Sequence, residues 1–254
     1  MSLLPGAEPY SADGGPVGVL VVHGFTGSPQ SMRPWAEHLA AAGYTVSLPR
    51  LPGHGTRWED MQQTRWPDWY GEVDNAFSAL VARCEQVFVT GLSMGGTLSL
   101  RLAEQRPDEV AGLVLVNPSV ISKDRRLLVL PLLKRIMATQ PPIANDIKKP
   151  GVTELAYDKM PLHAAASLIQ LWAVTRADLG KITAPVLMYR STVDHVVEPA
   201  SGEVLRRDLR CPLEERILAD SYHVATLDND APTIFEGSVD FINSHTTAPT
   251  GSGG

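Results

Sequence analysis

The most informative stretch of this 254-residue chain is Val87-Phe88-Val89-Thr90-Gly91-Leu92-Ser93-Met94-Gly95-Gly96. Its first half is apolar and β-branched and has the length of a buried strand. Its second half contains the pattern G-x-S-x-G, and leucines at helical spacing follow until Pro107. Strand, sharp turn and helix in this order predict a nucleophile elbow, which holds the Ser93 hydroxyl at the carboxyl edge of a sheet and at the N-terminus of a helix. A glycine-rich turn with an incidental serine is the simpler alternative.

Apolar runs of strand length alternate with helix-like segments on both sides of this stretch. Because several of these runs, such as Val17–Val22 and Val110–Val116, are apolar throughout, they predict strands buried on both faces of a parallel sheet. The further expected strands are Val17–Val22, Tyr44–Leu48, Val110–Val116, Pro185–Tyr189 and Glu215–Leu218. The sequence therefore predicts an α/β fold with a mostly parallel, doubly wound sheet.

The alternation stops between residues 119 and 182. Helix-like pieces at Leu127–Met137, Thr153–Lys159 and Leu162–Arg176 are separated there by prolines. An insertion of this size predicts a small helical cap, or lid, over the sheet. We expect residues 1–118 and 183–245 to form the core, residues 119–182 the cap, and residues 246–254 a flexible tail.

Composition excludes several classes of protein. A formal net charge of −6 and the lack of a Lys/Arg run argue against a nucleic-acid partner. Cys84 and Cys211 lie far apart without metal-ligand spacing and are expected to be reduced thiols, although a disulfide between them stays open. Residues 1–15 lack the pattern of a signal peptide, and no stretch has the length to span a bilayer, so we expect a cytoplasmic protein.

A serine nucleophile needs a base and an acid that orients the base. In this type of fold they follow in the order Ser, Asp, His, on loops after successive strands. Asp194 and His223 each come five residues after the end of an expected strand, and they are the predicted acid and base. Other acids and histidines fit less well by position: Asp178, Glu198, Asp208, Asp220, His38, His163, His195 and His245.

The oxyanion of a tetrahedral intermediate needs at least two backbone N–H donors. We expect these from Met94, directly after the nucleophile, and from Phe25 in the loop after the first expected strand. His23 and His54 lie near these loops, and a structural role is favoured for both.

Several motifs resemble those of the α/β-hydrolase superfamily, over residues 17–242. Within it, the chain is similar to the bacterial monoacylglycerol lipases and small carboxylesterases. The widely shared motifs are His23-Gly24-Phe25-Thr26-Gly27-Ser28-Pro29, Leu51-Pro52-Gly53-His54-Gly55-Thr56 and the elbow. The segments Lys149–Tyr157 and Ser221–Asp228 point to the subfamily.

This resemblance implies a cap that narrows an apolar tunnel for one acyl chain. It makes Glu154 a candidate for hydrogen bonding to the alcohol part and Ile143 a candidate tunnel residue. A solvated glutamate and an ordinary core isoleucine are the alternatives.

We therefore expect a serine ester hydrolase that works through an acyl-enzyme on Ser93, without metal or cofactor. The expected substrates are monoacylglycerols or short-to-medium-chain esters. An acyltransferase or thioesterase would use the same triad, and a non-catalytic binding protein of this fold is a weaker alternative. The oligomeric state stays open.

The stretch Arg125–Arg135 places basic residues around an apolar run. Such a segment can rest transiently on a lipid surface. A cap helix whose leucines pack on the core, with its charges in water, is the favoured alternative because Pro131 would interrupt an interfacial helix.

Overall fold

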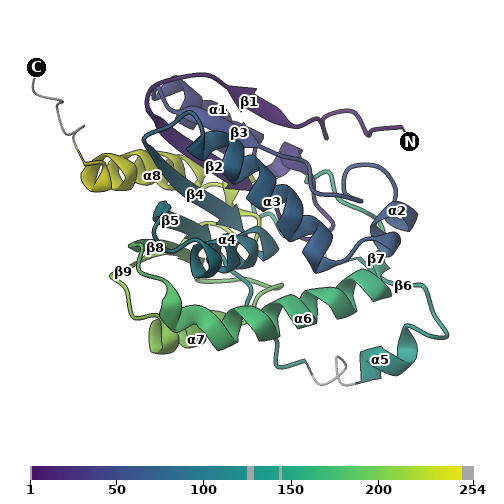
Figure 1. Cartoon of the computed structure of the whole chain (residues 1–254). Helices are drawn as coiled ribbons and strands as arrows, with labels where there is room; N and C mark the ends of the chain where they lie inside the picture. The colour runs from purple at the N-terminus through teal and green to yellow at the C-terminus, as the bar shows by residue number, and fades with distance from the viewer. Residues whose placement is uncertain (1, 125–128, 143–144, 248–254) are drawn as a thin grey trace, which may run out of the picture.

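The computed structural model describes residues 2–124, 129–142 and 145–247 (Figure 1). Within them, seven strands form a sheet in the order β1-β3-β2-β4-β5-β8-β9. β1 pairs antiparallel with β3, and the other neighbouring strands pair in parallel. The strands are β1 (Tyr10–Ala12), β2 (Val17–Val22), β3 (Thr45–Leu48), β4 (Gln86–Leu92), β5 (Val110–Val116), β8 (Val186–Ser191) and β9 (Leu213–Leu218). The expected α/β fold with a mainly parallel sheet is confirmed.

The central strands are buried on both faces, as their continuous apolar runs predict. In β2, Leu20 and Val22 belong to the apolar cluster on one face, and Val19 and Val21 to the cluster on the other. All four side chains have no exposed surface. Because successive side chains of a strand point to opposite faces, each strand contributes to both halves of the core.

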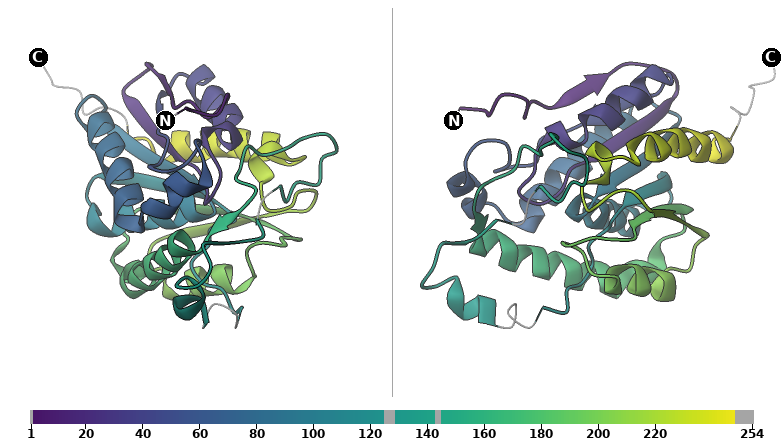
Figure 2. Two further views of the ribbon diagram at one scale, coloured as in Figure 1. Left: turned by 90° about the vertical axis from the view of Figure 1, so that its right-hand side faces the viewer. Right: turned by 180° about the vertical axis from the view of Figure 1, so that it is seen from behind.

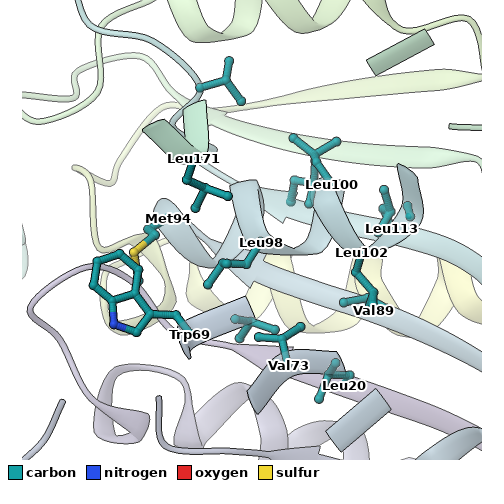
Figure 3. Packing of buried hydrophobic residues seen from close by; sticks show 14 of the residues in the cluster. Leu20, Trp69, Val73, Val89, Met94, Leu98, Leu100, Leu102, Leu113 and Leu171 are labelled. Carbon is teal, nitrogen blue, oxygen red and sulfur yellow. The ribbon is translucent and has the colours of Figure 1, made fainter. Parts of the chain in front are cut away.

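Helices cover both faces of the sheet, as the two further views in Figure 2 show. α1 (Arg33–Ala41) and α8 (Ala231–His245) pack on one face. The helices on the other face are α3 (Trp66–Val81), α4 (Met94–Gln105), α6 (Leu162–Asp178) and α7 (Ala200–Asp208). Figure 3 shows Met94 and Leu98 of α4 lying between Trp69 of α3 and Leu171 of α6. The helix that follows Ser93 is thus fixed between two neighbouring helices.

Short elements complete the chain. Two of them, β1 and α2 (Trp58–Gln63), fall in parts for which the sequence predicted no element. The single turns of 3-10 helix are η1 (Pro29–Ser31), η3 (Leu179–Lys181) and η4 (Ala225–Leu227). Within the predicted cap lie α5 (Leu130–Leu133) and an antiparallel pair formed by β6 (Thr139–Gln140) and β7 (Met160–Pro161).

The expected helix over Thr153–Lys159 is wrong. The Leu155 N–H donates to the Gln30 side-chain oxygen at 2.9 Å, and the Tyr157 N–H donates to the Thr26 carbonyl at 3.2 Å. The backbone of this segment therefore bonds to the loop after β2 instead of to its own preceding turn. A local helical pattern yields here to contacts between segments more than 100 residues apart.

The predicted boundaries of the cap, at residues 118 and 182, stay a prediction. α6 lies between them, and it packs against α4 and α3 of the sheet's helix layer. Ile143 and Arg125–Leu128 lie outside the described residues.

Cys84 and Cys211 carry free thiols. In the described part of the chain, no helix is both long enough and apolar enough to cross a membrane.

Candidate active site

Ser93 occupies the sharp turn between β4 and α4. Its backbone has φ 56° and ψ −117°, a left-handed conformation that is strained for a residue with a side chain. Its N–H donates to the Val116 carbonyl at 3.0 Å, which fixes the turn against β5. A Cβ on Gly91 would lie 2.5 Å from the Gly95 carbonyl oxygen, and a Cβ on Gly95 would collide with the Val22 carbonyl oxygen. The turn therefore requires glycine at both positions.

Asp194 and His223 meet at the carboxyl ends of β8 and β9. The Nδ1 of His223 donates to Oδ2 of Asp194 at 2.8 Å, and both side chains are 7% exposed. The other oxygen, Oδ1 of Asp194, accepts the N–H groups of Val196 at 2.8 Å and Val197 at 2.7 Å. With these bonds made, Nε2 is the ring nitrogen of His223 that remains to accept a proton.

The charges of this pair reinforce each other. Burial alone would lower the pKa of His223, but the Asp194 carboxylate and, more weakly, Glu154 and Asp146 raise it above its ordinary value. Burial alone would raise the pKa of Asp194, but His223 and the N–H groups of Val196 and Val197 lower it. Asp194 is therefore ionised near neutral pH and stabilises the imidazolium form of His223.

One cavity of about 680 Å³ joins most of the predicted site residues. Ser93, Asp194, His223, Phe25 and Glu154 all line it. Much of its remaining wall is apolar and includes Ile121, Leu130, Leu133, Met160, Ala165, Leu168, Ile169 and Trp172. A nucleophilic hydroxyl and an acid–base pair thus share a large, mainly apolar chamber.

The predicted oxyanion donors lie around Ser93. Met94 is the first residue of α4, where a backbone N–H has no acceptor within the helix. Gly24, which precedes Phe25, is so close that a Cβ on it would lie 3.6 Å from the Cβ of Ser93. The loop after β2 therefore passes beside Ser93, and α4 begins directly after it.

His23 links the loop after β2 to the loop after β3 through hydrogen bonds. Its Nδ1 donates to the Gly24 carbonyl at 3.0 Å, and its Nε2 accepts the Leu51 N–H at 3.1 Å. Burial lowers its pKa to about 4, so the ring is neutral near pH 7. His54 packs edge-on against His23, with the ring centroids 5.1 Å apart. These contacts fit the structural role that the sequence favoured for both histidines.

Glu154 reaches the cavity from the segment before β7. Its N–H donates to Oδ1 of Asn145 at 2.6 Å. Its carboxylate lies close to Gly27, because a Cβ added to that glycine would be only 2.7 Å from Oε1 of Glu154. Burial raises its pKa, while the charge of His223 and hydrogen bonds to Asn145 and Ser31 lower it by less. The carboxyl group is therefore partly desolvated and close to the base.

Asn117 is a residue that the sequence marked only as the end of a strand. Its Nδ2 donates to Oγ of Ser191 at 2.9 Å and to the His223 carbonyl at 2.8 Å, and its Oδ1 accepts the Ser191 N–H at 2.8 Å. It ties the end of β8 to the His223 loop. The signal that could have found it is an asparagine directly after a buried strand, since asparagine tolerates the positive φ of 44° found here.

The short helix α5, which lies within the predicted cap, and the turn after it carry both buried and exposed apolar side chains. Leu130 and Leu133 face the cavity and pack near Leu162 and Ala165. Leu132 of α5 is 63% exposed, and Ile136, in the turn that follows α5, is 74% exposed.

A sequence model of the serine aminopeptidase S33 family matches residues 17–230. The chain belongs to this family of α/β hydrolases. A thermostable monoacylglycerol lipase of Bacillus sp. (strain H-257) is 47% identical to this S33-family chain, over 96% of the chain and 97% of the relative. A carboxylesterase of Bacillus subtilis (strain 168) is 25% identical, over 92% and 96%.

Solved structures agree with this S33-family assignment. The metagenome-derived lipolytic enzymes LipS and LipT include a structure with a TM-score of 0.93 and 44% identity, which covers 96% of this chain and 100% of that one. A monoacylglycerol lipase structure from Paleococcus ferrophilus, with a TM-score of 0.76 and 23% identity, supports the fold. The expected class of enzyme, a carboxylic ester hydrolase, is confirmed by these relatives.

Proposed function

We propose that this enzyme releases a fatty acid from monoacylglycerols or short-to-medium-chain esters, through an acyl-enzyme on Ser93. The observation that carries the proposal is the 2.8 Å bond between His223 and Asp194 in the cavity that Ser93 also lines. The 47% identity to a monoacylglycerol lipase over nearly the whole chain supports this choice of substrate.

The first half of the reaction forms the acyl-enzyme. The Ser93 Oγ attacks the ester carbonyl carbon while Nε2 of His223 takes its proton. The negative oxygen of the tetrahedral intermediate accepts hydrogen bonds from the N–H groups of Phe25 and Met94. When the C–O bond of the ester breaks, His223 gives the proton to the leaving alcohol oxygen, and Ser93 keeps the acyl group.

The second half regenerates the serine. A water molecule attacks the acyl carbon and gives a proton to His223. The second tetrahedral intermediate then collapses, the fatty acid leaves, and His223 returns the proton to the Ser93 oxygen. Asp194 stays ionised throughout and holds Nδ1 of His223 as the donor, so that Nε2 is always the nitrogen that exchanges protons.

The cavity suits a substrate with one chain. Its apolar wall, which includes Leu168 and Trp172, removes the acyl chain from water, at about 0.8 kcal/mol for each buried methylene. Glu154 supplies a carboxylate on the same cavity for the hydroxyl groups of the alcohol part. The role proposed for Ile143, as a residue of the acyl tunnel, falls outside the described residues.

The test is a panel of 1-monoacylglycerols, di- and triacylglycerols and p-nitrophenyl esters of graded chain length, each with the wild type and with Ser93→Ala. We expect turnover of monoacylglycerols that depends on Ser93 and exceeds turnover of triacylglycerols. Retained hydrolysis by Ser93→Ala would contradict the nucleophile. An added acceptor alcohol that captures most of the acyl group would instead identify an acyltransferase, and preference for acyl thioesters a thioesterase.

We also propose that the cap rests transiently on lipid surfaces. The support is the exposure of Leu132 in α5 and of Ile136 in the turn after it, beside the basic residues Lys134 and Arg135. Ile136→Asp should lower the fraction of protein that sediments with phosphatidylglycerol vesicles, because a charge replaces the side chain that would enter the lipid. Ile217→Asp is the control, since Ile217 is 54% exposed on the edge strand β9. Equal binding of wild type and Ile136→Asp would refute this role.

A cytoplasmic location stays a prediction, which cell fractionation would test.

A further inference from the structure

Asp146 lies against both loops that carry the acid and the base. Its Oδ2 accepts the N–H of His195 at 3.0 Å and the N–H of His223 at 3.2 Å. Its Oδ1 accepts a hydrogen bond from Nδ1 of His195 at 2.7 Å, and its carbonyl accepts the Val224 N–H at 3.1 Å. The side chain is 13% exposed and lines the cavity.

These bonds join three parts of the chain that are distant in sequence. His195 directly follows Asp194 after β8, and His223 follows β9, while Asp146 comes from the segment before β7. Asp194 and His223 bond to each other through side chains that can rotate. The bonds from Asp146 reach backbone N–H groups, whose direction is set by the course of the loops, so they fix the loops themselves.

A second carboxylate anchors the segment that carries Asp146. Asp228 accepts the N–H groups of Lys148 at 2.7 Å, Lys149 at 2.9 Å and Tyr222 at 2.9 Å, and it is 1% exposed. The segment is therefore bonded to the His223 loop on both sides of that histidine. These bonds fix the backbone next to Asp146, so its carboxylate is held in place against the His223 loop.

Asp146 is also one of the charged groups around the His223 imidazole. The charged groups that act on His223 are Asp194 from the loop after β8, and Glu154 and Asp146 from the segment before β7. All three raise the pKa of His223, and Asp146 raises it least. His195, the other titratable group against Asp146, is 58% exposed.

We propose that Asp146 is a positioning residue for the reaction, which holds the acid loop and the base loop in register and adds negative charge beside the base. This inference rests on the proposed function, because it concerns the geometry of the proposed triad. It adds to the triad a carboxylate from the predicted cap, so that part of the insertion is required for the chemical step as well as for substrate binding.

Two variants separate the geometric from the electrostatic role. Asp146→Asn retains an oxygen for the N–H groups of His195 and His223 but removes the charge. Asp146→Ala removes both. We expect Asp146→Ala to lose up to about 100-fold in kcat with a smaller change in KM, because misplacement of a catalytic group by about 1 Å costs that much. Asp146→Asn should recover most of this loss.

The pH profile gives a readout that a purely structural role would not move. Without the charge of Asp146, the pKa of His223 falls, so the base stays neutral to lower pH. The acid limb of kcat/KM for Asp146→Asn should therefore move to lower pH relative to the wild type. The control is Asp220→Asn, which removes the 2.6 Å ion pair between Asp220 and Lys148 on the same segment without contacting either loop N–H. Its profile should match the wild type.

An NMR titration of the histidine ring nitrogens keeps this test independent of ester hydrolysis. We expect the resonances of His223 to titrate at lower pH in Asp146→Asn than in the wild type, whether or not the assayed ester is the right substrate. Wild-type kcat in Asp146→Ala, or an unchanged His223 titration in a folded Asp146→Asn, would overturn the inference. If the wild type hydrolyses none of the esters but His223 titrates at lower pH in Asp146→Asn, the proposed function is refuted and the inference about Asp146 stands.

Discussion

Replacing Asn117 with alanine should weaken both the fold and the reaction. The change removes three hydrogen bonds of 2.8–2.9 Å, to the Ser191 hydroxyl, the Ser191 N–H and the His223 carbonyl. Asn117 is 1% exposed, so water does not readily replace the lost partners. The Ser191 N–H and the His223 carbonyl are left without the partner that asparagine gives them.

The magnitude follows from these bonds. Each net hydrogen bond contributes about 1 kcal/mol, which gives about 3 kcal/mol for the set. The backbone at position 117 has φ 44°, where alanine costs about 1 kcal/mol more than a residue that tolerates this region. We therefore expect the free energy of unfolding to fall by about 4 kcal/mol. We also expect kcat to fall, because the carbonyl of the proposed base is no longer tied to β5.

Urea unfolding followed by tryptophan fluorescence measures the first effect, and steady-state hydrolysis of a soluble ester measures the second. Asn229→Ala is the matched control, since Asn229 is exposed and donates one hydrogen bond, of 3.0 Å, to the Asp220 carbonyl on the same loop. It should change stability by no more than about 0.5 kcal/mol. If Asn117→Ala unfolds at the same urea concentration as the wild type, the bonds at Asn117 do not carry the stability assigned to them.

Two further predictions concern catalysis. Because the pKa of His223 is raised and only the neutral ring accepts a proton, activity should decline on acidification at a higher pH than for an unperturbed histidine; an activity profile that stays flat through this region would argue against a histidine base. Ala165→Leu should shorten the preferred acyl chain, because Ala165 lines the cavity from α6 and the larger side chain would occupy room that the substrate uses. The rate of hydrolysis of p-nitrophenyl esters should then fall about tenfold for long acyl chains and less for short ones. An equal loss at every chain length would show that the acyl chain does not lie against Ala165.

The sequence was most informative where structure follows from local residues. Continuous apolar runs predicted the buried parallel strands, and the G-x-S-x-G pattern predicted a turn at Ser93 that only small neighbours permit. The order of residues along the chain pointed to Asp194 and His223, and these two are hydrogen-bonded in the structure. Chain order suffices here because parallel strands bring their carboxyl ends to the same edge of the sheet.

Local patterns were misleading where distant contacts decide the backbone. Thr153–Lys159 has helix-like spacing but bonds to the loop after β2, and α2 and β1 are short elements whose sequence signals are weak. In Thr153–Lys159, the hydrogen bonds to the loop after β2 outweigh the small differences in local propensity.

The fold, the elbow and the residues proposed as nucleophile, acid and base could all be predicted from the order of residues, because each depends on residue type and position along the chain. Only the tertiary structure revealed the roles of Asn117 and Asp146, and the shape of the cavity. Their hydrogen bonds join residues separated by 49 to 106 positions, and no spacing rule in one sequence specifies such pairs. They form only after the sheet has brought the ends of its strands together.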